Sequence, residues 1–204
     1  MRGLADRVAV VTGAASGIGR AIANRLAEEG TRVLGIDLQS GDMPDNKSLV
    51  GHLLLDLTEK NSTLQVLDWL NSTFGSCDIL VNAAGISEFC VFDDRDSNVY
   101  ERTMEVNLAA VSRMIRDLLP LLRKSDQARI INIGSICSEF ASPGLSAYVV
   151  SKHAVLGLTR ALASELGPAG ITVNCIQPGA ILTGITASSF ESDPSFKEHW
   201  KKKA

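Results

Sequence analysis

The chain has 204 residues, of which 45% are hydrophobic and 21% are charged, and its formal net charge is −3. A chain of this length fits one domain with a single core, and so small a net charge gives no reason to expect a nucleic-acid partner. No apolar run approaches the length of a bilayer span, and the four cysteines lack metal-ligand spacing. These features predict a cytoplasmic globular protein with one domain, residues 1–204, no membrane partner and no metal site.

Short apolar runs alternate with longer segments of helical periodicity, which is typical of a parallel sheet covered by helices. We expect strands at residues 7–12, 31–37, 52–55, 78–82, 129–135 and 171–177. Helices are expected at residues 17–29, 58–74, 147–166, and from 96 or 97 to about 123. The alternation predicts an α/β, doubly wound, three-layer αβα fold.

Residues 12–19 read Thr-Gly-Ala-Ala-Ser-Gly-Ile-Gly and connect the first expected strand to the first expected helix. Glycines at such a junction permit a tight turn and let a pyrophosphate approach backbone N–H groups at the positive end of the helix. A glycine-rich connection made only for close packing is the alternative. The order of strand, loop and helix favours a dinucleotide site that includes Gly13, Ser16, Gly17, Ile18 and Gly19.

Asp37 is expected at the end of the second strand, about twenty residues beyond the glycine loop. A carboxylate there accepts hydrogen bonds from both ribose hydroxyls of NAD and repels the 2′-phosphate of NADP. Ser16 is neutral and Leu38 is apolar, so the positions around the expected cofactor favour NAD over NADP. An ordinary aspartate at a strand end is the alternative, and Arg20 and Arg32 leave dual cofactor use open.

Tyr148 and Lys152 lie four residues apart in a segment expected to be helical, which places them on one helical face. The positive charge of the lysine ammonium, with that of oxidised nicotinamide, favours the phenolate and lowers the tyrosine pKa from its usual value of about 10, so Tyr148 is a candidate general acid and base. Ser135 is expected at the end of the fifth strand, where its hydroxyl can hydrogen-bond a substrate oxygen. Tyr100 has no lysine four residues on, and we interpret it as a packing residue.

Together these motifs resemble the short-chain dehydrogenase/reductase family over essentially the whole chain, in its Thr-Gly-x-x-x-Gly-x-Gly and Tyr-x-x-x-Lys branch. The resemblance implies a Rossmann-type sheet with strand order 3-2-1-4-5-6 and hydride transfer between nicotinamide and a secondary alcohol or ketone. It also implies that Lys152 binds the nicotinamide ribose and that Asn107 binds a water that relays protons to Lys152. For Asn107, a buried amide that satisfies a backbone group is the alternative.

Three further segments match cofactor contacts of the family, and each follows an expected strand. Ligands bind at the carboxyl ends of strands in open α/β sheets, and this shared edge favours a site over isolated turns or caps. Asp56 would meet the adenine, and Ile181 and Thr183 would hold the nicotinamide end. The residues in these segments are Asp56, Leu57, Asn82, Ala83, Ala84, Gly85, Pro178, Gly179, Ile181 and Thr183.

The family usually adds a seventh strand and a C-terminal tail, and the 204 residues stop before both, so we interpret residues 184–204 as a partial substrate lid. Resemblance also implies a homodimer or homotetramer. Phe89, Phe92 and Phe140 predict an apolar pocket that suits a small apolar or ring-bearing alcohol or ketone. Acidic residues near one rim, such as Glu88 and Asp93, disfavour an anionic substrate.

The leading interpretation is an NAD(H)-dependent oxidoreductase of secondary alcohols or ketones with a tyrosine as acid and base. One alternative is an NADPH-dependent reductase similar to the beta-ketoacyl carrier-protein reductases, against which Asp37 argues. A second alternative is a regulatory protein that binds a dinucleotide and does no chemistry. The joint presence of Asn107, Ser135, Tyr148 and Lys152 argues against it.

Overall fold

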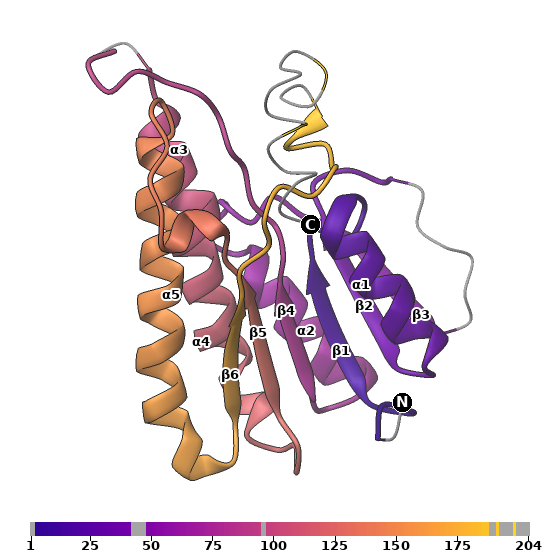
Figure 1. The fold of residues 1–204 in the computed structure, drawn as a ribbon. Coiled ribbons are helices and arrows are strands. Elements are labelled where there is room, and N and C mark those ends of the chain that lie inside the picture. Colours follow the sequence, from indigo (N-terminus) through magenta and orange to yellow (C-terminus); the bar gives the residue numbers. More distant parts are fainter. Residues whose placement is uncertain (1–2, 42–47, 95–96, 188–190, 192–197, 199–204) are drawn as a thin grey trace.

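The computed structural model describes residues 3–41, 48–94, 97–187, 191 and 198. In this part of the chain, six strands form one parallel sheet in the order β3-β2-β1-β4-β5-β6 (Figure 1). The strands are β1 (Val8–Thr12), β2 (Arg32–Asp37), β3 (Leu49–Leu54), β4 (Ile79–Asn82), β5 (Arg129–Ile133) and β6 (Thr172–Ile176). The predicted Rossmann-type class and strand order are confirmed.

Helices connect the strands and cover both faces of the sheet (Figure 1). They are α1 (Gly17–Glu28), α2 (Ser62–Thr73), α3 (Val99–Met104), α4 (Ala110–Leu122) and α5 (Ser146–Leu166), with a π-helical turn η1 (Glu105–Ala109) and two 3-10 turns, η2 (Ile136–Ser138) and η3 (Gly167–Ala169). In the described part, α1 packs on one face of the sheet, whereas α2, α4 and α5 pack on the other. This arrangement gives the three layers.

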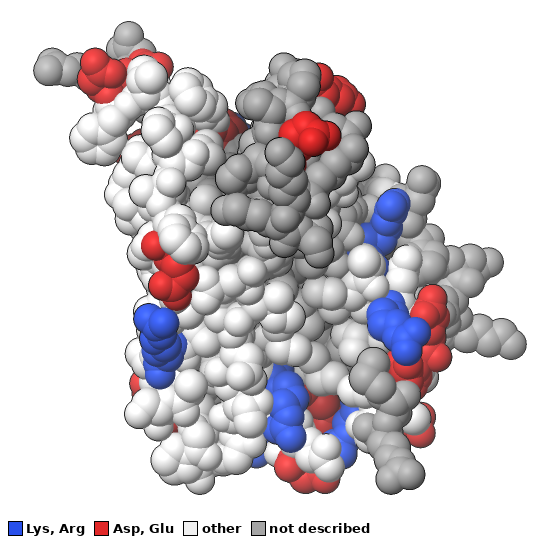
Figure 2. Space-filling model, viewed as in Figure 1, with Lys and Arg blue, Asp and Glu red and all other residues white. Residues whose placement is uncertain are grey.

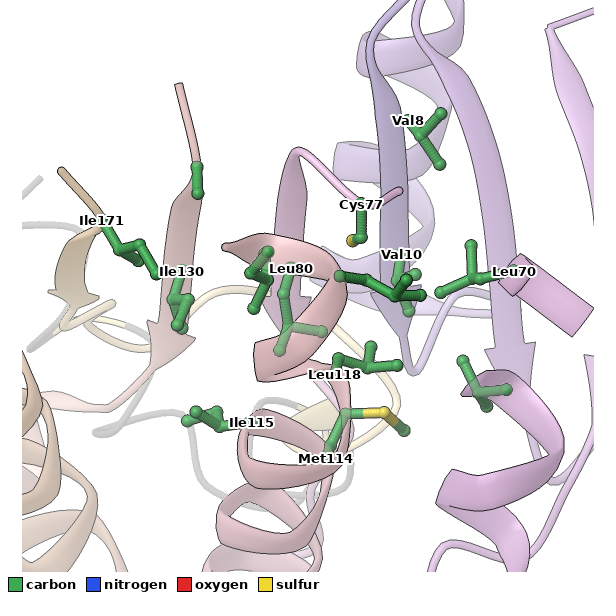
Figure 3. Close-up of a cluster of buried hydrophobic side chains, with 14 of the residues drawn as sticks. Val8, Val10, Leu70, Cys77, Leu80, Met114, Ile115, Leu118, Ile130 and Ile171 are labelled. Atoms are coloured by element: carbon green, nitrogen blue, oxygen red, sulfur yellow. The ribbon is translucent and has the colours of Figure 1, made fainter. Parts of the chain in front are cut away.

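The central strand β1 is buried along its whole length because helices cover it on both sides. Ala9 and Val11 point to α1, and Val8 and Val10 point to the opposite layer. The larger core lies in that opposite layer, where α4 contributes an apolar stripe at three- and four-residue spacing. Figure 3 shows its members Val8, Val10, Leu70, Cys77, Leu80, Met114, Ile115, Leu118, Ile130 and Ile171.

Two element starts differ from the sequence prediction. The helix α2 begins at Ser62 rather than at residue 58, because Asp56 Oδ1 accepts hydrogen bonds from Thr58 N at 2.8 Å and Thr58 Oγ1 at 2.7 Å. These bonds make Thr58 part of a turn. The strand β3 begins at Leu49 rather than at residue 52, because its backbone pairs with Val33 of β2 before the apolar run starts.

The long helix predicted up to about residue 123 is divided into α3, η1 and α4. In the π-helical turn η1, each backbone hydrogen bond spans one residue more than in an α-helix, and such turns occur often at functional sites. Asn107 lies in this turn. Periodicity of apolar residues does not reveal one extra residue in a turn, which is why the sequence predicted a single uninterrupted helix.

The strand β6 lies at the edge of the sheet in the described part of the chain. Val173 is buried, whereas Thr172, Asn174 and Ile176 are exposed on the other side of the strand. Figure 2 shows that this side of the molecule carries few charged side chains over β5 and β6. One face of β6 is therefore open where the structure is described.

Membrane, metal and disulfide features complete the description. No helix among the described residues combines the length and apolar character needed to cross a bilayer. The described residues also contain no group of three side chains that could hold a metal ion. All four cysteines are free, and Cys77 is buried while Cys90, Cys137 and Cys175 are half-buried.

Candidate active site

A cleft of about 420 Å³ runs along the carboxyl ends of the strands. It begins at the glycine loop after β1, passes Asp37 and Asp56, and ends beside Ser135, Tyr148 and Lys152. All site residues predicted from the sequence line this cleft except Asn82 and Asn107. The topology explains why these residues lie along one cleft, because the sheet order reverses beside β1 and the loops after β1 and β4 diverge there.

The glycine loop is packed tightly against the segment that follows β4. Gly13 has a φ of +67°, and a Cβ added to it would lie 2.9 Å from Ala84 Cα. A Cβ on Gly19 would lie 2.1 Å from the carbonyl oxygen of Gly13. Thr12 Oγ1 accepts hydrogen bonds from the backbone N–H groups of Ala83 at 3.0 Å and Ala84 at 3.1 Å. Close packing therefore accounts for both of these glycines, and it also forms one wall of the cleft.

The amino end of α1 opens onto the cleft through Gly17, Ile18 and Gly19. Ser16 is the N-cap residue, and its side chain makes no capping hydrogen bond. The first N–H groups of this helix are thus left without a side-chain acceptor, and the helix dipole adds partial positive charge at that end. This donor set fits an anionic pyrophosphate group.

The carboxylate of Asp37 has a role that the sequence did not reveal. Its Oδ2 accepts a hydrogen bond from Ala15 N at 2.9 Å, and its Oδ1 accepts one from Gln39 N at 3.1 Å. Asp37 therefore lines the cleft and also connects the glycine loop to the end of β2 through a hydrogen bond. Each carboxylate oxygen can accept a second hydrogen bond, so the group still fits a ribose diol.

The two arginines that left dual cofactor use open lie away from the cleft. Arg32 is at the amino end of β2, where its Nε donates to Asp6 O at 3.1 Å and its guanidinium stacks on Phe74 at 4.8 Å. Arg20 is exposed on α1 and does not line the cleft. Lys152 is the single cationic side chain that lines the cleft in the described part of the chain.

Asp56 lines the cleft, and its side chain also accepts the hydrogen bond from Thr58 N that forms the turn before α2. Asn82 does not line the cleft, and its predicted cofactor contact stays a prediction. Its Nδ2 donates to Asn132 Oδ1 at 2.9 Å, and Asn132 Nδ2 donates to Thr159 Oγ1 at 2.9 Å. The Asn82 side chain is buried and ties β4, β5 and α5 together beneath the site.

The pKa of Tyr148 is raised above its usual value in the chain alone, whereas the sequence prediction of a lowered pKa combined the positive charges of Lys152 and oxidised nicotinamide. Burial is the largest cause, a hydrogen bond with Ser135 opposes it, and the nearby Cys137 thiol raises the pKa further. Lys152 Nζ lies 5.6 Å from the centroid of the Tyr148 ring and donates to Ile133 O at 2.8 Å. Burial lowers the pKa of Lys152 to about 8. The Lys152 ammonium, which was expected to lower the tyrosine pKa, therefore donates to a backbone carbonyl, and burial disfavours its charged form.

The side chain of Asn107 holds the segment after β4. Its Oδ1 accepts from Ile86 N at 2.8 Å and its Nδ2 donates to Ile86 O at 2.9 Å. This is the alternative that the sequence left open, a buried amide that satisfies backbone groups. A Cβ added to Gly85 would lie 3.2 Å from Asn107 Oδ1 and 3.6 Å from Lys152 Nζ, so Gly85 leaves room between the two groups. The proton-relaying water stays a prediction.

Two loops meet through Phe89 and Gly144, and the phenylalanines predicted to form the pocket, Phe89, Phe92 and Phe140, do not line the cleft. Phe89 covers Gly144, where an added Cβ would lie 2.0 Å from the phenyl ring, and Cys90 N donates to Gly144 O at 2.9 Å. The exposed fractions of Phe89, Phe92 and Phe140 are 73%, 83% and 64%, so these rings are available for contact. Glu88 is paired with Arg102, which reduces its effect on an anionic substrate.

Some lining residues were missed by the sequence reasoning, including Gln39, Thr58, Val106 and Thr186. Gln39 and Thr58 directly follow predicted contacts, so extending each segment by one residue would have found them. Thr186 N and Ala187 N both donate to Thr183 O, and Thr186 Oγ1 accepts from Thr183 N at 3.0 Å. This turn forms the described start of the predicted lid, and most of residues 184–204 lie outside the described residues.

Comparison with known proteins supports this arrangement. The 3-oxoacyl-[acyl-carrier-protein] reductase FabG of Vibrio cholerae is 35% identical over 187 residues, which cover 90% of this chain and 77% of the relative. A candidate NAD(P)-dependent gluconate 5-dehydrogenase from Beutenbergia cavernae, solved with bound NADP, is 35% identical with a TM-score of 0.85, and the match covers 94% of this chain and 79% of that one. A 4-hydroxyisoleucine dehydrogenase solved with NADH is 32% identical with a TM-score of 0.78, and the match covers 93% and 82%.

The family profile described as short chain dehydrogenase matches residues 7–194, which is most of the chain. Members of this family act as oxidoreductases on alcohol or keto groups, and the related proteins above carry dehydrogenase or reductase names. The sheet order, the glycine loop and the Ser135, Tyr148 and Lys152 cluster agree with that membership. The chain therefore belongs to the short-chain dehydrogenase family and is an oxidoreductase.

Proposed function

We propose that this chain transfers hydride between NAD(H) and a neutral, apolar secondary alcohol or ketone, with Tyr148 as the general acid and base. The observation that supports this most directly is the continuity of one cleft, which joins the glycine loop and Asp37 to Ser135, Tyr148 and Lys152. A bound nicotinamide dinucleotide supplies the hydride acceptor or donor. The chain supplies the binding groups and the proton.

In the oxidation direction, the phenolate of Tyr148 accepts the hydroxyl proton of the alcohol. The Ser135 hydroxyl donates a hydrogen bond to the same substrate oxygen, where negative charge develops as the proton leaves. In this proposal Lys152 binds the ribose beside the reacting ring, and Asn107 holds the segment at Ile86 that borders this region. In reduction the same phenol returns its proton to the carbonyl oxygen.

The preference for NAD depends on Asp37, since relatives have been solved with either dinucleotide. Its carboxylate fits a ribose diol, and a 2′-phosphate placed beside it would meet a like charge. In the described part of the cleft, no arginine or lysine other than Lys152 lines the wall to compensate that phosphate. Both facts favour NAD.

Substitutions of Asp37 test both the preference for NAD and the hydrogen bond by which Asp37 holds the glycine loop. Asp37→Asn removes the charge but keeps an oxygen that can accept from Ala15 N. We expect it to reduce the ratio of kcat/KM for NAD to that for NADP by about tenfold or more, with kcat largely retained. Asp37→Ala leaves Ala15 N without its acceptor, and we expect weaker binding of both dinucleotides. Equal NAD and NADP selectivity in wild type and Asp37→Asn would contradict this assignment.

An NADPH-dependent beta-ketoacyl-type reductase is the second candidate, favoured by the 35% identity to FabG of Vibrio cholerae. The Asp37 carboxylate argues against it for the reasons above. Rates with NADH and NADPH on one keto substrate separate the two candidates. The predicted homodimer or homotetramer stays a prediction under either function.

A matched pair of substrates tests the proposed function and substrate class. Methyl 3-hydroxybutyrate is neutral, and 3-hydroxybutyrate has the same chain with a carboxylate. Because Lys152 is the only cationic side chain in the described cleft lining and is buried, we expect kcat/KM with NAD to be about tenfold or more higher for the ester. The absorbance of reduced nicotinamide provides the readout. A higher value for the acid would overturn the substrate class, and no turnover across a panel of ring-bearing alcohols would favour the regulatory alternative.

A further inference from the structure

Two buried serines connect the four candidate catalytic residues from outside the cleft. Ser138 ends the 3-10 turn η2, and Ser151 lies in α5 between Tyr148 and Lys152. Their exposed fractions are 2% and 0%, and neither lines the cleft. Neither can therefore contact a substrate or a dinucleotide there.

Ser138 links the end of β5 to α5. Its Oγ accepts a hydrogen bond from the backbone N–H of Ser135 at 3.2 Å and donates one to the carbonyl oxygen of Lys152 at 2.9 Å. In return, the Ser135 side chain caps the same turn by accepting from Cys137 N at 3.1 Å. The backbone of Ser135 is thus connected to the backbone of Lys152 through one hydroxyl.

Ser151 makes an equivalent connection to the π-helical turn η1. Its Oγ accepts a hydrogen bond from Asn107 Nδ2 at 3.1 Å and donates one to the carbonyl oxygen of Tyr148 at 2.8 Å. Asn107 in turn holds Ile86 at the cleft wall. Each serine therefore accepts from one member of the candidate catalytic set and donates to another.

We propose that Ser138 and Ser151 are positioning residues that hold Ser135 and Asn107 at fixed distances from Tyr148 and Lys152. The proposal rests on the proposed function, because the four residues matter as a set only if they do the chemistry. Each hydroxyl lies between a buried donor and a backbone carbonyl, so alanine leaves the Ser135 N–H or one Asn107 N–H without an acceptor. Without the Ser138 hydroxyl, the backbone of Ser135 loses its hydrogen-bonded connection to α5. Without the Ser151 hydroxyl, the side chain of Asn107 loses its connection to α5.

Catalysis is sensitive to such displacement. A shift of about 1 Å in a reacting group can reduce a rate by as much as about a hundredfold. We expect Ser138→Ala and Ser151→Ala each to lower kcat about tenfold at pH 7, with the dissociation constant for NAD changed less than about twofold, because the dinucleotide end of the cleft is untouched.

The pH profile distinguishes positioning from loss of stability. The hydrogen bond between Ser135 and Tyr148 lowers the tyrosine pKa. When Ser135 is held less firmly, that effect weakens and the apparent pKa of the kcat profile for alcohol oxidation moves upward. The deficit of Ser138→Ala should therefore be largest near neutral pH and shrink at alkaline pH.

Ser62→Ala is the matched control. Ser62 is also a buried serine, with 1% exposure, and its Oγ donates to a backbone carbonyl, that of Glu59, at 2.8 Å. It lies at the start of α2 and does not line the cleft. We expect Ser62→Ala to lower the unfolding midpoint in urea to a similar extent as the other two variants and to keep the wild-type kcat and pH profile.

The outcomes separate this inference from the proposed function. If wild type turns over alcohol and both serine variants match Ser62→Ala in kcat and pH profile, the positioning role is wrong and the proposed function stands. If wild type shows no turnover with any alcohol, the proposed function fails and this inference fails with it. If the alanine variants do not fold, Ser138→Cys and Ser151→Cys keep a weaker donor and acceptor at each position, and a lower kcat is expected of both, with the upward shift of the profile in Ser138→Cys.

Discussion

Replacing Tyr148 with phenylalanine should lower kcat for alcohol oxidation by about 10²–10⁴-fold while the protein keeps most of its affinity for NAD. The substitution removes only the hydroxyl, so the ring remains beside Lys152 and the cleft keeps its shape. What is lost is the group that we propose to exchange a proton with the substrate. Initial rates give kcat, and dinucleotide binding in the absence of alcohol gives the affinity.

Tyr100 provides the matched control, since it is the other tyrosine of the chain, is partly exposed and does not line the cleft. Tyr100→Phe makes the same chemical change and should leave kcat at the wild-type value. Full activity of Tyr148→Phe would remove Tyr148 from the role of acid and base.

The direction of the Tyr148 pKa gives this role a pH signature. Burial raises the pKa, and the Ser135 hydrogen bond offsets only part of that effect. Oxidation needs the phenolate, whose fraction grows as pH rises, so its rate should increase from pH 7 toward alkaline pH. Reduction needs the neutral phenol and should be favoured at lower pH. In Tyr148→Phe, the residual rate should lose this dependence.

Replacing Lys152 with methionine should abolish efficient turnover and, at the same time, stabilise the fold at pH 7 by about 2 kcal/mol. Lys152 is 5% exposed, and burial lowers its pKa from 10.5 to about 8, which corresponds to a penalty of about 3 kcal/mol for the charged form. Methionine has a similar length and no charge, although it loses the hydrogen bond to Ile133 O, worth about 1 kcal/mol.

The pH dependence of the stability gain follows from the same shift. Below about pH 8 both the folded and the unfolded chain carry the proton, so the folded chain bears the whole penalty. Between about pH 8 and pH 10.5 the folded chain loses the proton while the unfolded chain keeps it, and wild-type stability rises with pH. The advantage of Lys152→Met should therefore be full at pH 7 and much smaller at pH 10. Urea unfolding at the two pH values measures it.

Lys124→Met is the control for this pair of measurements. Lys124 also donates to a backbone carbonyl, that of Gly75 at 3.0 Å, but it is exposed, so its replacement relieves no burial penalty. We expect no gain in the free energy of unfolding from that change. A Lys152→Met protein that is less stable than wild type at pH 7 would show instead that the buried ammonium stabilises the fold.

Lys152→Met is thus expected to lower activity and to raise stability, which would show that Lys152 is kept for function at a cost in stability. A buried cation is costly, and a chain selected only for stability would have an apolar residue there. The carboxyl edge of the sheet tolerates this group because the Ile133 carbonyl accepts its hydrogen bond and the surrounding core supplies stability elsewhere. In the proposed function, this is the position from which a cation acts on both the tyrosine and a ribose.

Much of the architecture could be predicted from local pattern. The parallel sheet covered by helices followed from alternating apolar runs and helical segments, because parallel neighbouring strands need a crossover connection. The strand order came from the resemblance to the family. Gly13 and Gly19 were found because they lie in a glycine-rich junction between an expected strand and an expected helix. In the structure, a Cβ on Gly13 would meet Ala84 and a Cβ on Gly19 would meet the carbonyl oxygen of Gly13. Asp37, Ser135 and the Tyr148–Lys152 pair were found because spacing along one strand or helix already specifies where each residue emerges.

Other features depend on contacts between distant segments, which spacing does not encode. Asn82 was expected at the cleft, yet its amide meets Asn132, fifty residues away, beneath the site. The connections through Ser138 and Ser151 span 14 and 44 residues, and each serine alone reads as an ordinary polar residue. The sign of the Tyr148 pKa shift also required the fold, because desolvation depends on everything that packs around the ring, whereas the sequence reveals only the lysine four residues away.

The primary structure was thus enough to predict the sheet and the edge at which ligands bind, since both follow from short-range periodicity, and the resemblance to the family added the strand order and the set of candidate reacting groups. Only the folded chain decided how those groups are held and how readily they ionise. Burial and hydrogen bonding are properties of the assembled core, and they arise from residues that are neighbours in space but distant in sequence.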